Sequence, residues 1–181
     1  GWDNRTFHLG DTLLVRMPSA VHYVAQVEKE QRWLPILSRS ISLSIPIPVA
    51  QGMPCPEFPY PWSIYKWLPG ESLSSSPNVD QKPLAKSLAE FLRELQAIPT
   101  TDAPRPGPHC FFRGAHLNVY DAETQQAITS LASVVNVDLA SNVWSQALSC
   151  PYAVDPVWFH GDIAPGNLLM TDGQLSAVID F

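Results

Sequence analysis

The sequence has 181 residues, of which 45% are hydrophobic and 15% charged, and its formal net charge is −6 at pH 7. This length suffices for one domain or two small ones with a sizeable core. The acidic balance argues against a nucleic-acid partner, which usually requires a basic surface. No apolar run approaches the roughly 18 residues that a membrane span needs, so no membrane partner is expected either.

The cysteines Cys55, Cys110 and Cys150 are odd in number and contain no Cys-x-x-Cys pair. A disulfide framework or a structural zinc site is therefore not expected, and the predicted location is the reducing cytoplasm. The sequence shows no signal peptide. It begins with glycine rather than methionine, so we expect it to be a piece of a longer protein.

The first part of the chain has the pattern of strands and one helix. Residues 1–18 predict two strands joined at Gly10-Asp11, a dipeptide that favours a two-residue hairpin turn. A helix is predicted over Ser19–Leu37, with Ser19 as its N-cap. Two further strands are expected at 45–50 and 62–68, on either side of a proline-rich loop.

The rest of the chain is mainly helical in pattern. The clearest helical period ends at Pro99, and we expect its apolar stripe to pack in the core; the stripe consists of Leu84, Leu88, Phe91, Leu95 and Ile98. Two more helices are predicted over residues 122–135 and 139–148. Composition therefore changes from strand-rich to helix-rich at about Leu68.

The C-terminal segment places isolated polar residues among apolar neighbours, namely His160, Asp162, Asn167 and Asp180. Burying an unpaired polar group is costly, so these residues are expected to bind something. One open interpretation is structural: Asp162 and Asn167 would cap a surface loop, and Asp180 would end a strand.

The dipeptide at 172–173, Asp-Gly, predicts a hairpin that places Asn167 opposite Val178. Asp180 would then lie on the same face, diagonally across from Asn167, at a backbone distance of roughly 7–8 Å. Amide and carboxylate oxygens are ligands that suit Mg²⁺, which takes its remaining ligands from water and phosphates. The spacing therefore predicts a magnesium site at Asn167 and Asp180.

Asp162 lies five residues before Asn167, in a loop that contains Pro165 and Gly166. Such a loop can hold a carboxylate at the mouth of an ion site, where it accepts a proton from an attacking hydroxyl. His160 is expected to brace the loop and is grouped with Asp162 as a catalytic candidate. A base, a metal-binding amide and a metal-binding carboxylate are the groups that phosphoryl transfer requires.

The run His160-Gly161-Asp162, with Asn167 farther on and Asp180-Phe181 at the end, resembles the catalytic core of the aminoglycoside phosphotransferase family. The resemblance implies an α+β, protein-kinase-like fold with two lobes. Residues 1–68 would form the strand-rich nucleotide-binding lobe, without its first strand. Residues 69–181 would form a partial, helical catalytic lobe.

The resemblance also implies roles for residues near the start of the chain. Gly1 would belong to the loop that covers the phosphates, and Arg16 would hold phosphate oxygens. A glutamate on the following helix would pair with Arg16. Glu28 and Glu30 both qualify, and the resemblance favours Glu30.

The segment after the fourth predicted strand resembles the hinge between the lobes, where backbone groups of Lys66, Trp67 and Leu68 would bind the purine edge. The function so implied is transfer of the γ-phosphate of ATP or GTP, with Mg²⁺, to a hydroxyl of a small molecule. The acceptor would be an aminoglycoside-like antibiotic or another amino-alcohol or sugar.

The sequence departs from the family pattern at its end, because it stops at Phe181, before the glycine expected next. Most of the acceptor-binding wall would then be missing, and the uncovered last strand predicts self-association. One alternative is a catalytically inactive nucleotide-binding or interaction module derived from a kinase-like protein. Another is a metallophosphoesterase site with His160 and Asp162 as direct ligands.

Overall fold

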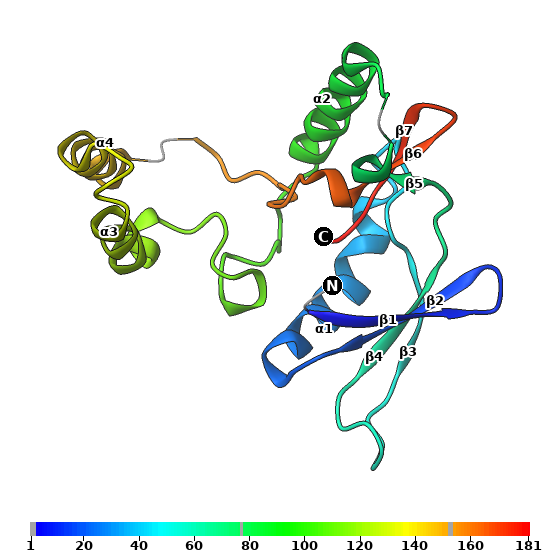
Figure 1. The fold of residues 1–181 in the computed structure, drawn as a ribbon. Coiled ribbons are helices and arrows are strands. Elements are labelled where there is room, and N and C mark those ends of the chain that lie inside the picture. The colour runs from blue at the N-terminus through cyan, green and yellow to red at the C-terminus, as the bar shows by residue number, and fades with distance from the viewer. Residues whose placement is uncertain (1–2, 77, 152–153) are drawn as a thin grey trace. The chain divides into compact units, whose positions relative to one another are not determined.

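The computed structural model describes residues 3–76, 78–151 and 154–181, and the chain divides into two compact units. Unit 1 comprises Gly1–Ala103 and Val157–Phe181, and unit 2 comprises Pro104–Pro156. Every strand of the described residues belongs to unit 1, which also contains two α-helices (Figure 1). This mixture confirms the predicted α+β class. This division separates Pro104–Pro156 from the rest of the chain. It does not test the boundary between two lobes expected after Leu68, which stays a prediction.

A four-stranded antiparallel sheet forms the first half of unit 1, in the order β1-β2-β4-β3. Its strands are β1 (Asn4–Leu9), β2 (Leu13–Pro18), β3 (Pro48–Gly52) and β4 (Trp62–Lys66).

The β1–β2 hairpin confirms the predicted pair of strands, but its turn is one residue longer than expected. Leu9 pairs with Leu13, so residues 10–12 form the connection, with Gly10 at φ +63°. The extra residue is Thr12, whose carbonyl accepts a hydrogen bond from the backbone N–H of Trp67 at 2.8 Å. The turn is therefore tied to the end of β4.

Helix α1 (Val24–Leu37) follows a 3₁₀ turn at Val21–Tyr23. The prediction that Ser19 caps this helix is wrong, because α1 begins at Val24 and Tyr23 is in the N-cap position. The backbone N–H and the hydroxyl of Ser19 donate instead to the carbonyl of Asp3. The buried residues of α1 are spaced by three or four and include one charged group; they are Val27, Glu30, Leu34 and Leu37. A glutamate on the core-facing stripe requires a polar partner inside unit 1.

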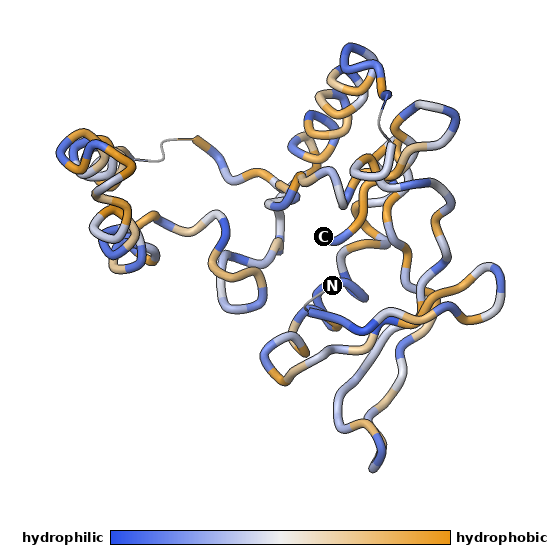
Figure 2. The backbone as a smooth tube through the Cα atoms, viewed as in Figure 1, coloured by the Kyte–Doolittle hydropathy of each residue, from blue (hydrophilic) through white to orange (hydrophobic). Residues whose placement is uncertain are grey.

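A second antiparallel sheet contains β5 (Glu71–Ser72), β6 (Leu168–Thr171) and β7 (Gln174–Val178), in that order. Helix α2 (Gln81–Ala97) packs against β7, and the side chain of Asp80 caps it by accepting from Lys82 N at 3.0 Å. Figure 2 shows hydrophobic and hydrophilic residues alternating along α2. Phe91 and Leu95 are almost fully buried, which confirms the predicted core stripe.

The core of unit 1 connects both sheets and both helices. It includes Leu34 of α1, Tyr65 of β4, Phe91 of α2 and Val178 of β7, and Phe181 packs against it. Residues far apart in the sequence are thereby fixed next to one another, because a close-packed interior allows little relative movement.

The β6–β7 hairpin has the predicted Asp172-Gly173 turn, with Thr171 opposite Gln174. The predicted pairing of Asn167 with Val178 is wrong, because Val178 pairs with Leu168. A β-bulge causes this shift of one residue: Leu169 pairs with Ala177 and Met170 with Leu175, which leaves Ser176 between them. The Ser176 hydroxyl donates to the Leu169 carbonyl at 3.1 Å and so satisfies a group that the bulge disturbs.

Unit 2 contains helices α3 (Asp121–Ser130) and α4 (Val137–Ser149), together with 3₁₀ turns at Pro108–Cys110 and Leu117–Tyr120. Helix α3 ends five residues earlier than the predicted 135, because residues 131–135 form turns. The indole N–H of Trp144 donates to Asp121 at 2.7 Å and links the two helices. None of the described helices combines the length and the apolar character needed to cross a membrane.

Candidate active site

The first part of the candidate site is the loop that begins at His160, a residue with only 7% of its surface exposed. Its Nδ1 accepts a hydrogen bond from the backbone N–H of Asp162 at 3.2 Å, and its Nε2 lies 2.9 Å from the carbonyl of Ile179. A nitrogen that accepts must be unprotonated, so the proton of the neutral ring is on Nε2, which donates to Ile179. His160 therefore ties the loop to the segment that carries Asp180.

Asp162 and Asn167 are in direct contact. The amide nitrogen of Asn167 donates to the backbone carbonyl of Asp162 at 3.0 Å and to its carboxylate Oδ2 at 3.2 Å. The backbone N–H groups of Ala164 and Asn167 close the loop by hydrogen bonds to the carbonyls of Asp162 and Ala164, each at 2.9 Å. Among the described residues Oδ1 of Asp162 has no hydrogen-bond partner, so this oxygen can accept a proton.

Asn167 and Asp180 do not share a strand face as the sequence predicted, because neither belongs to a strand. Asn167 ends the 3₁₀ turn Pro165–Asn167, and Asp180 follows the end of β7 with a left-handed backbone (φ +68°). The carbonyl of Asn167 accepts from the N–H of Ile179 at 2.9 Å, which places the asparagine beside the neighbour of Asp180. The bulge at Ser176 and this bond set Asn167 beside Ile179, one residue before Asp180.

Arg16 lies on β2, opposite Ser63 of β4. Its Nη1 is 3.4 Å from Oε2 of Glu30, and its Nη2 is 2.7 Å from Oδ1 of Asp180. The expected contact of Arg16 with Glu30 is thus present, whereas the shorter contact with Asp180 was not predicted. Burial opposes the charge of Arg16, but the two carboxylates outweigh it and raise the pKa of the guanidinium.

Tyr65 of β4 is a residue of the site to which the sequence analysis assigned no role. Its hydroxyl donates to Oε2 of Glu30, the same oxygen that faces Arg16. Burial, reinforced by the nearby Glu30 carboxylate, raises the pKa of Tyr65 above its usual value, so the phenol remains a hydrogen-bond donor. Nothing in the sequence near Tyr65 indicates this contact, since Glu30 is 35 residues away.

The predicted hinge follows β4, and its backbone donors are only partly available. The N–H of Lys66 donates to Ile47 at 3.2 Å, and the N–H of Trp67 donates to Thr12 at 2.8 Å. The N–H groups of Lys66 and Trp67 thus have protein partners, and the expected binding of a purine edge by backbone groups of these residues and Leu68 stays a prediction. Leu68 N has no backbone partner among the described residues. Gly1, the expected phosphate-loop glycine, lies outside the described residues.

The side-chain oxygens of Asn167 and Asp180 are of the kind that suits a magnesium ion. The amide nitrogen of Asn167 is engaged by Asp162, which leaves its oxygen for a cation, and the carboxylate of Asp180 is 46% exposed. Among the residues that the structure describes, no group of three or more His, Cys, Asp or Glu residues could hold a metal ion. Mg²⁺ commonly uses one or two protein carboxylates, with water and phosphate oxygens completing its shell.

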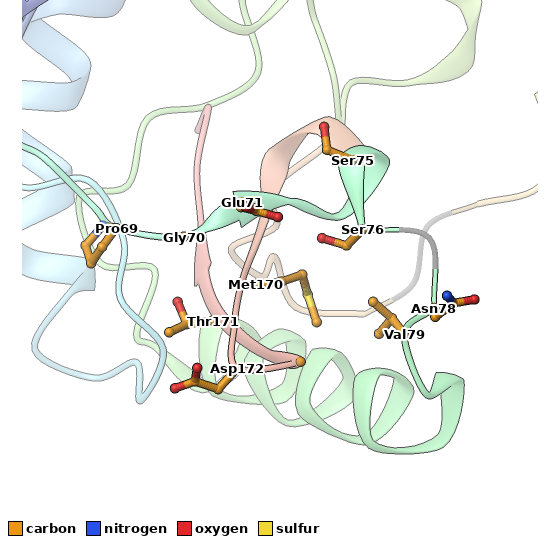
Figure 3. A pocket seen from close by; sticks show the side chains of 11 residues that line it. Pro69, Gly70, Glu71, Ser75, Ser76, Asn78, Val79, Met170, Thr171 and Asp172 are labelled. Atoms are coloured by element: carbon orange, nitrogen blue, oxygen red, sulfur yellow. The ribbon is translucent and has the colours of Figure 1, made fainter.

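A separate cavity of about 590 Å³ lies between the segment that begins at Pro69 and the β6–β7 turn (Figure 3). Pro69, Gly70 and Glu71 form one wall, and Met170, Thr171 and Asp172 form another. None of the residues assigned above to the nucleotide, the metal or the proton transfer lines this cavity.

Solved structures share this fold at low sequence identity. The GDP complex of a variant of aminoglycoside 2'-phosphotransferase IIIa aligns with a TM-score of 0.76 at 21% identity, over 99% of this chain and 63% of that one. A GDP and kanamycin complex of APH(2")-IIIa aligns with a TM-score of 0.71 at 21% identity, over 99% of this chain and 64% of that one. The macrolide 2'-phosphotransferase MphH from Brachybacterium faecium aligns with a TM-score of 0.59 at 17% identity, over 98% of this chain and 64% of that one.

The chain thus spans about 63% of the length of the first of these proteins. No curated protein matches the sequence. The profile of the phosphotransferase enzyme family, APH, matches residues 1–181. This match covers the whole sequence, and the fold and the His160 loop agree with it: the chain belongs to the phosphotransferase enzyme family.

Proposed function

We propose that the protein transfers the γ-phosphate of ATP or GTP to a hydroxyl group of a small molecule. The observation that carries this proposal is a set of contacts that links three separate segments of the chain. Asn167 contacts Asp162 and the N–H of Ile179, and the next residue, Asp180, contacts Arg16. A proton acceptor, two oxygen-bearing side chains and one cation linked in this way meet the needs of phosphoryl transfer, which depends mainly on positioning and charge neutralisation.

Asp162 is the proposed catalytic base. Its Oδ1 accepts the proton of the acceptor hydroxyl while the hydroxyl oxygen forms a bond to the γ-phosphorus. The bond from that phosphorus to the β–γ bridging oxygen breaks, and the nucleoside diphosphate leaves. The hydrogen bond from Asn167 to Oδ2 orients the carboxylate for this step. His160 has both ring nitrogens engaged with backbone groups, which supports a positioning role.

Asn167 and Asp180 are the proposed ligands of Mg²⁺, which when bound supplies charge neutralisation for the nucleotide phosphates. Arg16 is proposed to hold phosphate oxygens, and Glu30 to hold Arg16. At the hinge, the N–H of Leu68 and the carbonyl of Lys66 are proposed to bind the purine edge, because the N–H groups of Lys66 and Trp67 have protein partners.

The acceptor is proposed to be an amino-alcohol or amino-sugar. The net charge of −6 favours cationic ligands. Among proteins of similar fold, one was solved with kanamycin and another is a macrolide phosphotransferase. These proteins support antibiotics of both classes as first candidates.

The decisive experiment incubates the protein with ATP or GTP, Mg²⁺ and a panel of aminoglycosides, macrolides, choline, amino-alcohols and sugars. Mass spectrometry should detect one phosphate added to an acceptor. Tight binding of ADP or GDP without any phosphate transfer would instead support the inactive nucleotide-binding module. Phosphate release from esters, without nucleotide, would support the metallophosphoesterase.

We also propose that residues 1–181 self-associate. Several apolar side chains of unit 2 are more than half exposed, among them Val134, Leu139 and Val143. Exposed apolar patches favour association. Gel filtration with light scattering should give a mass above the monomer's 20.0 kDa, and a compact monomer would contradict this proposal. The predicted cytoplasmic location is proposed as well, supported by three free cysteines.

A further inference from the structure

Two donors share one buried oxygen inside unit 1. The Tyr65 hydroxyl and the Arg16 guanidinium both face Oε2 of Glu30. Tyr65 is 2% exposed and Glu30 is 4% exposed, so water does not compensate the carboxylate. A buried carboxylate is stable only if hydrogen bonds replace its lost hydration. The protein donors at Oε2 therefore decide how Glu30 is held.

The two contacts are unequal. Arg16 Nη1 lies 3.4 Å from Oε2, which is beyond the 2.7–3.2 Å of ordinary N–H···O bonds, whereas the Tyr65 hydroxyl is closer. Tyr65 thus supplies the principal hydrogen bond to Glu30. The Arg16 guanidinium also lies 5.9 Å from the centre of the Tyr65 ring, so the aromatic face borders the cation.

Arg16 makes its short contact elsewhere, from Nη2 to Asp180 at 2.7 Å. If Glu30 lost its phenol partner, its carboxylate would be left with Arg16 as its donor, and the guanidinium would be drawn toward α1. We propose that Tyr65 is a positioning residue for nucleotide binding, because its bond to Glu30 keeps Arg16 directed at Asp180 and at the phosphates. This inference rests on the proposed function.

The test is Tyr65→Phe, which removes one oxygen and keeps the ring in the core. Binding of ADP and of GDP should weaken about three- to tenfold, the effect of losing one hydrogen bond at the site. With a competent acceptor, the loss should appear mainly in KM for the nucleotide rather than in kcat. Unchanged nucleotide affinity, with only a lower melting temperature, would show that Tyr65 is a core residue and overturn the inference.

The matched control is Ser42→Ala, which like Tyr65→Phe removes one oxygen. The Ser42 hydroxyl donates to Glu94 Oε2 at 2.9 Å, so it links the segment after α1 to α2 without a hydrogen bond to Glu30 or Tyr65. This variant should lower stability and leave ADP and GDP affinity unchanged. An equal loss of affinity in Ser42→Ala would mean that any loss of stability in unit 1 weakens nucleotide binding, and would overturn the specific role of Tyr65.

A double-mutant cycle tests whether Tyr65 acts through Glu30. In a Glu30→Gln background the buried charge is absent, so adding Tyr65→Phe should not weaken nucleotide binding further. A further loss in that background would contradict the inference, and this comparison remains valid if Tyr65→Phe alone does not fold. If the unaltered protein binds neither ADP nor GDP, the proposed function fails. If it binds them and Tyr65→Phe binds equally well, only this inference fails.

Discussion

Arg16 and Asp180 are separated by 164 residues in the sequence, and their side chains meet at 2.7 Å. Arg16, which is proposed to hold phosphates, thus forms an ion pair with Asp180, the carboxylate proposed to bind the metal. A divalent cation at Asp180 must compete with the guanidinium, because Arg16 already binds Oδ1 of this carboxylate. Phosphate oxygens of the nucleotide offer Arg16 an alternative partner, so metal and nucleotide should bind more strongly together than separately.

The first prediction concerns Arg16→Gln. Affinity for ADP and GDP should fall about tenfold or more, since charge-assisted bonds to phosphate are lost. Affinity for Mn²⁺ alone, measured by electron paramagnetic resonance, should rise, because Asp180 loses its internal counter-ion. Arg32→Gln is the control, since the Arg32 guanidinium lies over the Trp33 ring and forms no ion pair within the described residues. Unchanged Mn²⁺ affinity in Arg16→Gln would contradict the competition.

The second prediction concerns Asp162→Ala. Phosphate transfer should be abolished, while ADP and GDP binding should remain within about threefold, because Asp162 is assigned to the acceptor proton rather than to the nucleotide. Asp11→Ala, in the exposed β1–β2 turn, is the control and should retain activity. Transfer that persists in the Asp162 variant would remove this residue from the role of base.

The third prediction concerns His160→Ala. Its loss removes the bond to the Ile179 carbonyl and leaves the N–H of Asp162 without its partner. The free energy of unfolding should fall by about 1–3 kcal/mol, as expected for unsatisfied buried groups. The same variant should lower kcat more than it raises KM for the nucleotide, whereas the exposed His22→Ala should change neither. Full kcat in a destabilised His160→Ala protein would exclude the positioning role.

The fourth prediction concerns alkaline pH. The pKa of Tyr65 is raised in the folded protein above its ordinary value of 10.0, mainly by burial. Below pH 10 the Tyr65 phenol is protonated in both the folded and the unfolded protein, so its contribution to the free energy of unfolding is fully present. As the pH rises above 10 the unfolded state loses the proton first, and folding weakens by at most about 1.4 kcal/mol per pH unit.

Denaturant unfolding at several pH values from 9 to 11 checks this prediction. Tyr65→Phe should flatten the alkaline decline, whereas Tyr60→Phe should not, because the ring of Tyr60 contacts Phe58 rather than a carboxylate. An identical alkaline decline in both variants would assign the effect to other groups.

The sequence by itself determined the features that depend only on residues close together in the chain. The amphipathic spacing of α2 and the Asp-Gly turn at 172–173 are local properties, so their patterns predicted both correctly. The spacing from His160 to Asn167 likewise indicated the family, since short loops hold such residues together whatever surrounds them. The profile match over residues 1–181 confirms that family.

Only the tertiary structure decided which distant groups meet. The bulge at Ser176 shifts the hairpin register by one residue, and no local pattern indicates it, because Ser176 is held by contacts across the hairpin. The contacts of Arg16 with Asp180 and of Tyr65 with Glu30 depend on how α1 and the strands pack. Buried charges must find partners wherever the core places them, so these pairs follow from packing rather than from spacing.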